Sequence, residues 1–291
     1  SNHSYYNKVA MSNLSWESKD LETGNLFFNF ADMKPGDLGE DTIDLTVNSN
    51  DAYACMNLSV TGTPENDQTE PEALVDTTAG TNEGELQNEL HFTFWADDGD
   101  NVLENGEVNK VFVDNKTLGD ISAEGDIALA DSAKNIWTGQ TGPMTGAQTY
   151  YIGKVFCLGS LSQTPVTDGA GDPTVASGFS CDGELVTNAS QTDGVTGDVS
   201  FTAVQSRNND NFVCGRSQEE EPVVPVIDGV VGTDEWAGCT TINLANEKGT
   251  ACVIAYTDYM YVKYELNDPT DDRSDNSYPG NDKLGLNINP A

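Results

Sequence analysis

Polar and apolar side chains alternate along the stretch Thr42-Ile43-Asp44-Leu45-Thr46-Val47. Successive side chains of a β-strand point to opposite faces of its sheet, so this alternation is typical of a strand that buries one face. The same two-residue period returns in five further stretches before Cys214, which are residues 56–60, 90–94, 110–113, 150–156 and 199–204. Together they predict a domain built from short strands.

Turn-forming residues separate these stretches. Lys34-Pro35-Gly36-Asp37 and the Gly- and Asp-rich run 168–173 are two of them. Proline fixes φ and glycine accepts a positive φ, which favours tight turns. Helical stretches are few, and residues 123–134 are a candidate for short helical turns. We therefore predict an all-β protein, with a jelly-roll or β-sandwich domain followed by a smaller β-sandwich module.

A linker is predicted at residues 215–225, which read Gly-Arg-Ser-Gln-Glu-Glu-Glu-Pro-Val-Val-Pro. Three consecutive acids and two prolines favour an extended segment. Beyond the linker, a sequence pattern typical of strands continues up to Asn289-Pro290-Ala291, which predicts a truncated second domain. The predicted parts are an N-terminal segment (1–19), a jelly-roll domain (20–214), the linker (215–225) and a partial β domain (226–291).

The charge balance excludes two classes of partner. Thirteen Lys and Arg against 48 Asp and Glu give a net charge of −35, which disfavours binding to nucleic acid or to an anionic membrane. Such a surface suits divalent cations, high salt or an exposed polymer, and solubility alone is the alternative. No apolar run approaches the ~20 residues that span a bilayer. The chain opens at Ser1 without a leader, and we interpret it as a mature exported chain.

The six cysteines form no Cys-x-x-Cys pair and have no nearby histidine, which argues against a zinc site. An even number at wide spacing predicts disulfides, and with them an extracellular or cell-surface location. Five N-x-S/T sequons agree with export and are candidate glycosylation sites, although chance alone gives several in such a chain: Asn2, Asn13, Asn57, Asn115 and Asn188.

Cys239 and Cys252 flank a predicted hairpin turn at residues 247–249, so a cross-strand disulfide is expected there. The other four cysteines permit three pairings. The preferred pairing joins Cys181 with Cys214 around one hairpin and leaves Cys55 with Cys157.

The acidic stretch 97–107, between two predicted strands, is the best candidate for a metal site. It carries six oxygen-bearing side chains: Asp97, Asp98, Asp100, Asn101, Glu104 and Glu107. Hard cations such as Ca²⁺ prefer such ligands. The stretch is not an EF-hand, because Leu103 stands where that loop requires glycine. We expect calcium here, with a solvated hairpin tip as the alternative.

Enzyme motifs are absent from the sequence. It contains no G-x-S-x-G, no H-E-x-x-H, no P-loop and no dinucleotide fingerprint, and its only histidines are His3 and His91. We predict that the protein is not an enzyme. A secreted hydrolase with a carboxylate pair stays open as a third hypothesis, because acids occur throughout the chain.

Three stretches carry a resemblance to a known family. Leu26-Phe27-Phe28-Asn29-Phe30-Ala31-Asp32 precedes the Pro-Gly turn and the strand 42–47, a run from Phe94-Trp95 to Glu107 follows, and Gln191-Thr192-Asp193 comes before Phe201. Over residues 20–214 this order resembles the TasA/camelysin family of secreted surface and biofilm fibre proteins.

The resemblance implies a jelly roll that polymerises when the N-terminal segment of one subunit adds a strand to its neighbour. The candidate donor is residues 1–15, with Tyr5, Tyr6, Val9, Met11 and Leu14 as anchors. A disordered or self-paired N-terminus is the alternative. The leading hypothesis is therefore a homopolymeric, head-to-tail fibre subunit. The second is a monomeric cell-surface protein that binds glycans or calcium.

The C-terminal part resembles the start of a family-9 carbohydrate-binding or DOMON-like β-sandwich. Its cues include Asp228-Gly229, Glu235-Trp236 and Asp258-Tyr259-Met260-Tyr261-Val262. The resemblance implies sugar or haem binding. Haem is disfavoured because Met260 alone is available as an axial ligand, and glycans remain the expected partner, although alternating aromatic residues in a strand are more often core.

Overall fold

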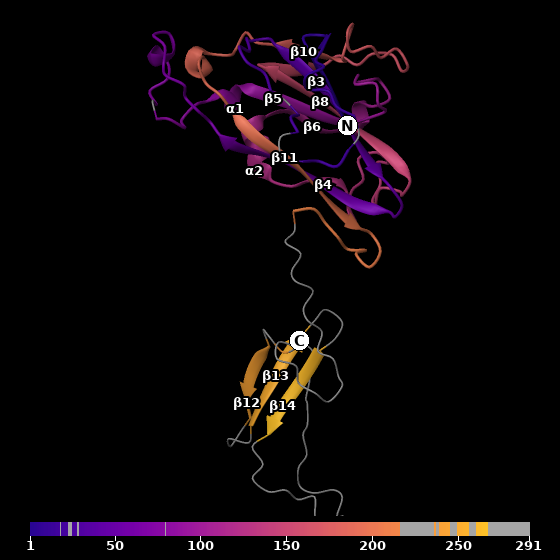
Figure 1. Ribbon diagram of the computed structural model, residues 1–291. Coiled ribbons are helices and arrows are strands. Elements are labelled where there is room, and N and C mark those ends of the chain that lie inside the picture. The colour runs from indigo at the N-terminus through magenta and orange to yellow at the C-terminus, as the bar shows by residue number, and fades with distance from the viewer. Residues whose placement is uncertain are drawn as a thin grey trace, which may run out of the picture. The chain divides into compact units, whose positions relative to one another are not determined.

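The computed structural model describes residues 1–215, apart from 18, 23, 24, 28 and 79, together with residues 236, 239–244, 249–255 and 260–266. The chain divides into two compact units, Ser1–Ser217 and Gln218–Ala291. Strands are the main element of both units (Figure 1), so the prediction of an all-β protein is confirmed. Residues 216–225 of the predicted linker lie outside the described part.

The first unit is a sandwich of two antiparallel sheets. The larger sheet has the order β2-β1-β3-β8-β5-β6, with β1 (Asn2–Tyr6), β2 (Val9–Ala10), β3 (Leu38–Val47), β5 (Leu90–Asp97), β6 (Val111–Thr117) and β8 (Gln148–Leu158). The smaller sheet has the order β11-β4-β7, with β4 (Ala52–Gly62), β7 (Ile127–Ala130) and β11 (Thr196–Gln205). A separate hairpin pairs β9 (Ser160–Gln163) with β10 (Phe179–Asp182). Each of the six alternating stretches of the sequence overlaps one of these strands.

Helices are short in the described part of the chain: α1 (Leu86–Glu89), α2 (Leu118–Glu124), η1 (Glu72–Leu74), η2 (Val108–Lys110) and η3 (Asn188–Ser190). The helical turns expected near 123–134 are wrong in position. Thr117 caps α2 by accepting a hydrogen bond from the Asp120 amide, and Gly125, with φ +78°, ends it. The residues that follow pair with β4 as strand β7 instead.

The main core lies between the two sheets. Alternate residues of the strands meet there, among them Ile43, Met56, Phe92 and Phe156, and all four are buried. Burial of one such side chain contributes about 1.5–3 kcal/mol to stability. The alternation found in the sequence is therefore the pattern that builds this core.

Each sheet also carries a smaller cluster on its outer face. On the larger sheet, Trp95 and Val155 pack with Leu103 and with Phe179 of the β9–β10 hairpin. Trp95 lies over Gly153, where a Cβ atom would fall 2.1 Å from the indole ring. This glycine gives the tryptophan its space, and the hairpin covers what would otherwise be an exposed apolar face.

The described part of the second unit is a three-stranded antiparallel sheet of β12 (Thr240–Asn243), β13 (Gly249–Ala255) and β14 (Met260–Leu266). The Lys263 ammonium lies 5.8 Å from the ring centroid of Trp236. Residues 226–235 and 267–291, Tyr256, Tyr259 and the Tyr261 side chain lie outside the described part. The sugar-binding role of this unit therefore stays a prediction.

Three disulfides pair Cys55 with Cys214, Cys157 with Cys181 and Cys239 with Cys252. The disulfide predicted around the β12–β13 hairpin is confirmed, whereas the pairs Cys181–Cys214 and Cys55–Cys157 are wrong. Cys55 and Cys157 lie on the outer faces of opposite sheets, with the main core between them. The order of cysteines along the chain carries no information about which face each one occupies.

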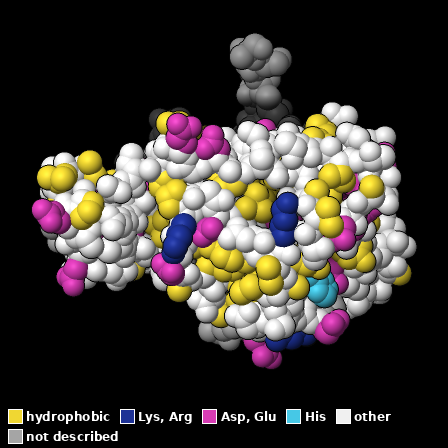
Figure 2. Space-filling model, turned by 90° about the horizontal axis from the view of Figure 1, so that it is seen from above, with side chains coloured by type: hydrophobic (Ala, Val, Ile, Leu, Met, Phe, Trp, Pro, Cys, Tyr) yellow, Lys and Arg dark blue, Asp and Glu magenta, His cyan; other side chains and the backbone are white. Residues whose placement is uncertain are grey.

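The described residues contain no helix long and apolar enough to cross a membrane. Figure 2 shows one face of the molecule, on which acidic side chains lie scattered among polar and hydrophobic ones. The acidic charge is spread over this face rather than gathered into one patch.

Candidate functional site

The acidic stretch 97–107 forms the connection between β5 and β6. Val102 and Leu103, in its middle, are fully buried, and Leu103 belongs to the cluster around Trp95. The Leu103 amide donates to the Ser177 carbonyl oxygen at 2.8 Å, and the Val166 amide donates to the Leu103 carbonyl oxygen at 3.1 Å. The stretch is thus a packed loop, which argues against the alternative of a solvated hairpin tip.

Asp97 shapes the start of this loop. Its Oδ2 atom accepts hydrogen bonds from the Gly99 and Asn101 amides, both at 3.2 Å, and its Oδ1 atom accepts one from the Trp95 indole at 3.2 Å. Gly99 and Asn101 have φ values of +114° and +66°. Glycine and asparagine tolerate such values better than other residues, so the local sequence matches the turn.

Three of the six predicted ligands converge. Asp97, Asp98 and Glu107 offer oxygen atoms within 4.8 Å of one another, with Asp97 and Glu107 buried and Asp98 exposed. Asn101 is buried beside them, and neither atom of its carboxamide has a hydrogen-bond partner among the described residues. We name Asp97, Asp98 and Glu107 the loop cluster.

The two other predicted ligands, Asp100 and Glu104, accept hydrogen bonds from backbone amides instead. Asp100 accepts a hydrogen bond from the Val102 amide at 3.0 Å. Glu104 accepts one from the Gly169 amide at 2.6 Å and so ties the loop to the neighbouring segment. Asp100 and Glu104 therefore serve the backbone of the loop, and the metal site in this loop stays a prediction.

The loop cluster is electrostatically suited to a cation. Burial raises the pKa of Asp97 to about 6, with smaller contributions from the charges of Asp100 and Asp98. Burial, followed by the charge of Asp97, raises the pKa of Glu107 to about 8. Carboxyl groups in such surroundings are stabilised by a proton or a metal ion. An all-oxygen donor set without histidine or cysteine fits Ca²⁺ rather than zinc.

The predicted donor segment is paired within its own chain. β1 runs antiparallel to β3, with Ser4 opposite Asp41 and Tyr6 opposite Gly39. Tyr6 stacks on Phe30, with ring centroids 4.8 Å apart, and its hydroxyl donates to Asp37 at 2.6 Å. The self-paired alternative therefore describes this state of the molecule.

The predicted anchors contribute unequally. Leu14 is buried, Tyr5, Tyr6 and Met11 are half-buried, and Val9 is 63 % exposed. Val9 therefore anchors nothing within its own chain, and its role as an anchor in a neighbouring subunit stays a prediction. In the hairpin formed by β1 and β2 it points to solvent.

Sequence reasoning missed a buried polar network beneath β1. Asn2 and Ser4 are buried and donate hydrogen bonds to Asp41. Asp41 also forms a fully buried ion pair with Lys154 at 2.6 Å, and Lys154 donates to the Phe27 carbonyl oxygen at 3.0 Å. The usable signal was the spacing of Asn2, Ser4 and Tyr6, which places them on one face of a strand.

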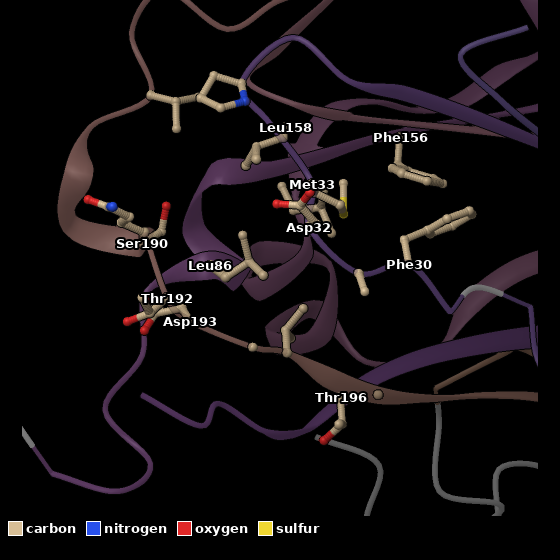
Figure 3. Close-up of a pocket in the computed structure, with 18 of the residues that line it drawn as sticks. Phe30, Asp32, Met33, Leu86, Phe156, Leu158, Ser190, Thr192, Asp193 and Thr196 are labelled. Atoms are coloured by element: carbon tan, nitrogen blue, oxygen red, sulfur yellow. The ribbon is translucent and has the colours of Figure 1, made fainter. Parts of the chain in front are cut away.

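A connector, residues 17–37, links the N-terminal segment to β3. Its described residues form neither helix nor strand. It lines a cavity of about 770 Å³ through Phe30 and Met33, opposite Leu158 and residues 186–197 (Figure 3). A second cavity of about 430 Å³ lies between Leu21 and Phe27 of the connector and residues 201–203 of β11.

The sequons differ in access. Asn2 is fully buried and donates to the Leu14 carbonyl oxygen at 2.8 Å, so the prediction of glycosylation at Asn2 is wrong for this folded state. Asn13, Asn115 and Asn188 are exposed. Asn57 is half-buried and donates to Asp126 at 2.9 Å.

The chain matches no protein-family profile and no curated protein sequence.

Proposed function

We propose that this protein is the structural subunit of an extracellular fibre, in which copies exchange their N-terminal strand β1. The observation that carries the proposal is the connector. It is long, its described residues lack regular structure, and cavities lie along it on the side of β11. Cavities beside a segment lower the cost of moving it, so the connector is suited to act as a hinge, and its movement requires Phe27 to leave the main core.

Strand exchange preserves the contacts of the folded chain. If β1 of one copy pairs with β3 of the next, every hydrogen bond of the β1–β3 ladder is re-formed between subunits. A head-to-tail exchange, in which each copy accepts a strand from one neighbour and donates its own to another, continues into a fibre, whereas a reciprocal exchange between two copies closes into a dimer.

The buried polar network supports a defined register for the exchange. Asn2 and Ser4 reach Asp41 only when β1 sits at one position along β3. A slip by one residue would turn these side chains away and leave the Asp41–Lys154 pair with fewer partners. Buried polar groups are well suited to fixing register in this way.

The extracellular setting is supported by the disulfides. All six cysteines are paired, which is typical of proteins that work in an oxidising environment. Three covalent cross-links and an acidic surface also suit a polymer that must persist in the medium.

A variant lacking residues 1–15 tests the proposal in two ways. Alone, it should remain monomeric by negative-stain electron microscopy, because it has no strand to donate. Added in a small fraction to the intact protein, it should shorten the fibres, because it accepts a strand but cannot pass one on. Fibres of unchanged length in the mixture would show that subunits associate by another surface.

Single substitutions on β1 provide the matched controls. Ser4→Leu removes a partner of Asp41 and overfills a buried site, so it should abolish fibres. His3→Ala changes an exposed residue of the same strand and should leave fibres intact. Far-UV circular dichroism of both variants separates loss of assembly from loss of folding.

A second candidate function is favoured by the loop cluster. In this second proposal the protein is a monomeric surface protein that binds Ca²⁺ through Asp97, Asp98 and Glu107, whose oxygens converge within 4.8 Å. Calorimetric titration of the chelator-treated protein with Ca²⁺ tests this, with Asp98→Asn as the weakened variant. Calcium binding by a protein that stays monomeric at high concentration would favour this candidate over the fibre.

A further inference from the structure

A second acidic cluster lies apart from the loop cluster. Its members come from distant parts of the chain: Glu65, Glu72, Asp76, Glu85 and Asp193. They form two groups, Glu65–Asp76–Glu85 and Glu65–Glu72–Asp193, and within each group the ligand atoms lie within 4.8 Å of one another. We name the five residues the Glu65 cluster, since Glu65 belongs to both groups.

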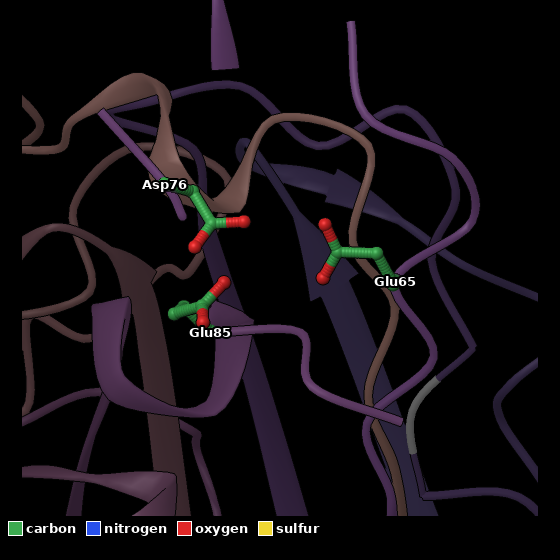
Figure 4. Close-up of side chains that lie close together, drawn as sticks. All are labelled: Glu65, Asp76 and Glu85. Atoms are coloured by element: carbon green, nitrogen blue, oxygen red, sulfur yellow. The ribbon is translucent and has the colours of Figure 1, made fainter. Parts of the chain in front are cut away.

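Glu65 is the residue that points to a ligand. Its side chain is 3 % exposed, and neither of its carboxylate oxygens has a hydrogen-bond partner among the described residues. One oxygen of Glu85 and one of Asp193 are likewise buried without a partner there. Figure 4 shows the carboxyl groups of Glu65, Asp76 and Glu85 facing a common space.

The remaining oxygens of the Glu65 cluster are held in place from outside. Glu72 accepts hydrogen bonds from the Thr69 amide at 3.0 Å and the Thr192 hydroxyl at 2.9 Å. Asp76 accepts from the amide and hydroxyl of Thr78, at 2.9 and 2.7 Å.

Asp193 is fixed in the same way, because its Oδ2 atom accepts from the Glu85 amide. Each of these carboxylates is thus oriented by neighbours that do not neutralise its charge. Asp193 Oδ1, Glu85 Oε2 and both oxygens of Glu65 have no partner among the described residues, and such oxygens beside held carboxylates suit a preorganised metal site.

The cluster lacks a positive counter-charge. None of its members forms an ion pair with lysine or arginine in the described part of the chain. Burial and the neighbouring carboxylates raise the pKa of Glu65, of Glu85 and of Asp193. Five acids at such short range need protons or a cation, because like charges repel strongly in a region with little water.

We propose that the Glu65 cluster binds Ca²⁺, with Glu65 as the ligand common to both groups. Calcium takes six to eight oxygen ligands in flexible geometry and accepts several carboxylates, whereas Mg²⁺ demands a strict octahedron and keeps much of its water. The absence of histidine and cysteine from the cluster disfavours zinc.

The bound ion connects two segments that are far apart in sequence. Glu65, Glu72, Asp76 and Glu85 belong to residues 65–85, and Asp193 follows η3. This junction continues the β4–β11 ladder, in which Thr196 lies opposite Gly62, and the Gly194 amide donates to the Pro64 carbonyl oxygen at 2.8 Å. Asp193 and Thr192 also line the larger cavity (Figure 3), so the ion orders one wall of it.

The test is calorimetric titration of the full chain with CaCl₂ after treatment with EGTA. Glu65→Gln and Asp193→Asn should each weaken one binding event by at least about 10- to 100-fold, the range seen when supporting residues of metal sites are removed. Glu70→Gln removes the same charge from an exposed neighbour and should bind like the unaltered protein. Asp98→Asn removes a ligand of the loop cluster, so a binding event that this variant weakens is assigned to the loop cluster and not to the Glu65 cluster.

Hydrogen exchange provides the second readout. Calcium should increase the protection of amides in residues 65–85 and 188–193 in the unaltered protein and in Glu70→Gln, and not in Asp193→Asn. Asp193 is only half-buried, so its variant serves if Glu65→Gln does not fold. Identical calcium affinity in the Glu65, Asp193 and Glu70 variants, or protection that is independent of calcium, would overturn the proposal and leave a buried group neutralised by protons.

Discussion

The loop cluster and the Glu65 cluster are built from the same chemical groups in different ways. Asp97, Asp98 and Glu107 come from one hairpin connection, and the buried side chain of Leu103 fixes that connection in the outer core. The Glu65 cluster draws on residues 65–85 and on Asp193. The described residues of 65–85 include no buried apolar side chain, and Leu74, in η1, is 82 % exposed.

This difference predicts different dependence on a cation. A loop anchored by hydrophobic burial and by hydrogen bonds to Asp97 keeps its shape without an ion. The five acids of the Glu65 cluster gather beside the end of the β4–β11 ladder, and they repel one another until their charge is neutralised. We therefore expect the loop cluster to keep its geometry without an ion, whereas the Glu65 cluster needs its ion to become ordered.

The largest effect is expected from removing the anchor of the loop. Leu103→Ala should lower the free energy of unfolding by about 2–5 kcal/mol, because it leaves a cavity beside Trp95. Leu74→Ala, its counterpart near the Glu65 cluster, should change stability by less than about 0.5 kcal/mol because the side chain is exposed. Urea denaturation measures both, and equal losses would remove the contrast between the regions.

Glu40 provides a single buried acid with which both clusters can be compared. Burial raises its pKa to about 8, and the charges near it are those of Asp41 and Lys8. Below pH ~4.5 the carboxyl group is protonated in both the folded and the unfolded state and contributes nothing. Between that value and pH 8 the unfolded chain releases the proton first, so stability falls as the pH rises.

Glu40→Gln should therefore be more stable than the unaltered protein above pH 8, by roughly 5 kcal/mol, and equally stable near pH 4. Thermal unfolding at a series of pH values checks this. The difference should be the same with CaCl₂ and with EGTA, since Glu40 belongs to neither cluster. If the difference in stability between the two proteins did not change with pH, Glu40 would be ionised in the folded state over the same pH range as in the unfolded chain.

Glu65→Gln should have a smaller effect whose sign depends on calcium. In EGTA the substitution removes repulsion among buried carboxylates and should raise the midpoint of thermal unfolding. In excess CaCl₂ it removes a ligand, and the midpoint should fall below that of the unaltered protein. Glu70→Gln should show no such reversal. If the Glu65 variant shifts in the same direction under both conditions, the cluster is not a calcium site.

The smallest effect is expected at Asp98, the exposed member of the loop cluster. Asp98→Asn should change stability in EGTA by less than about 0.5 kcal/mol, because the loop is held by its apolar and backbone contacts. It should still reduce the response of amides in residues 98–107 to calcium in hydrogen exchange. A large loss of stability in EGTA would place Asp98 among the residues that hold the loop.

Local patterns made much of the fold predictable. The alternation at 42–47 and at 150–156 lies in β3 and β8, which are paired neighbours in the larger sheet. The hairpin around residues 247–249 was also enough to pair Cys239 with Cys252. In each case the relevant residues are close in sequence, so periodicity and turn chemistry carry the information.

The candidate sites show where that information ends. The stretch 97–107 was visible because its acids are contiguous, although Asp100 and Glu104 turned out to hold backbone amides. Acids at Glu65 and Asp193 looked like any others in a chain with 48 of them. Nothing in their neighbourhood signals that they meet, because the contact depends on the pairing of β4 with β11, two strands that lie far apart in sequence.

By itself, the sequence determined the β-strands, the acidic surface, the commitment of the cysteines to disulfides and the position of one acidic loop. Tertiary structure alone decided that Cys55 pairs with Cys214, that Asp41 and Lys154 are buried beneath β1, and that the Glu65 cluster exists. The physical reason is the range of the interactions. Side-chain alternation is set by adjacent residues, whereas a partner across the sandwich is set by sheet order and by the face that each side chain occupies.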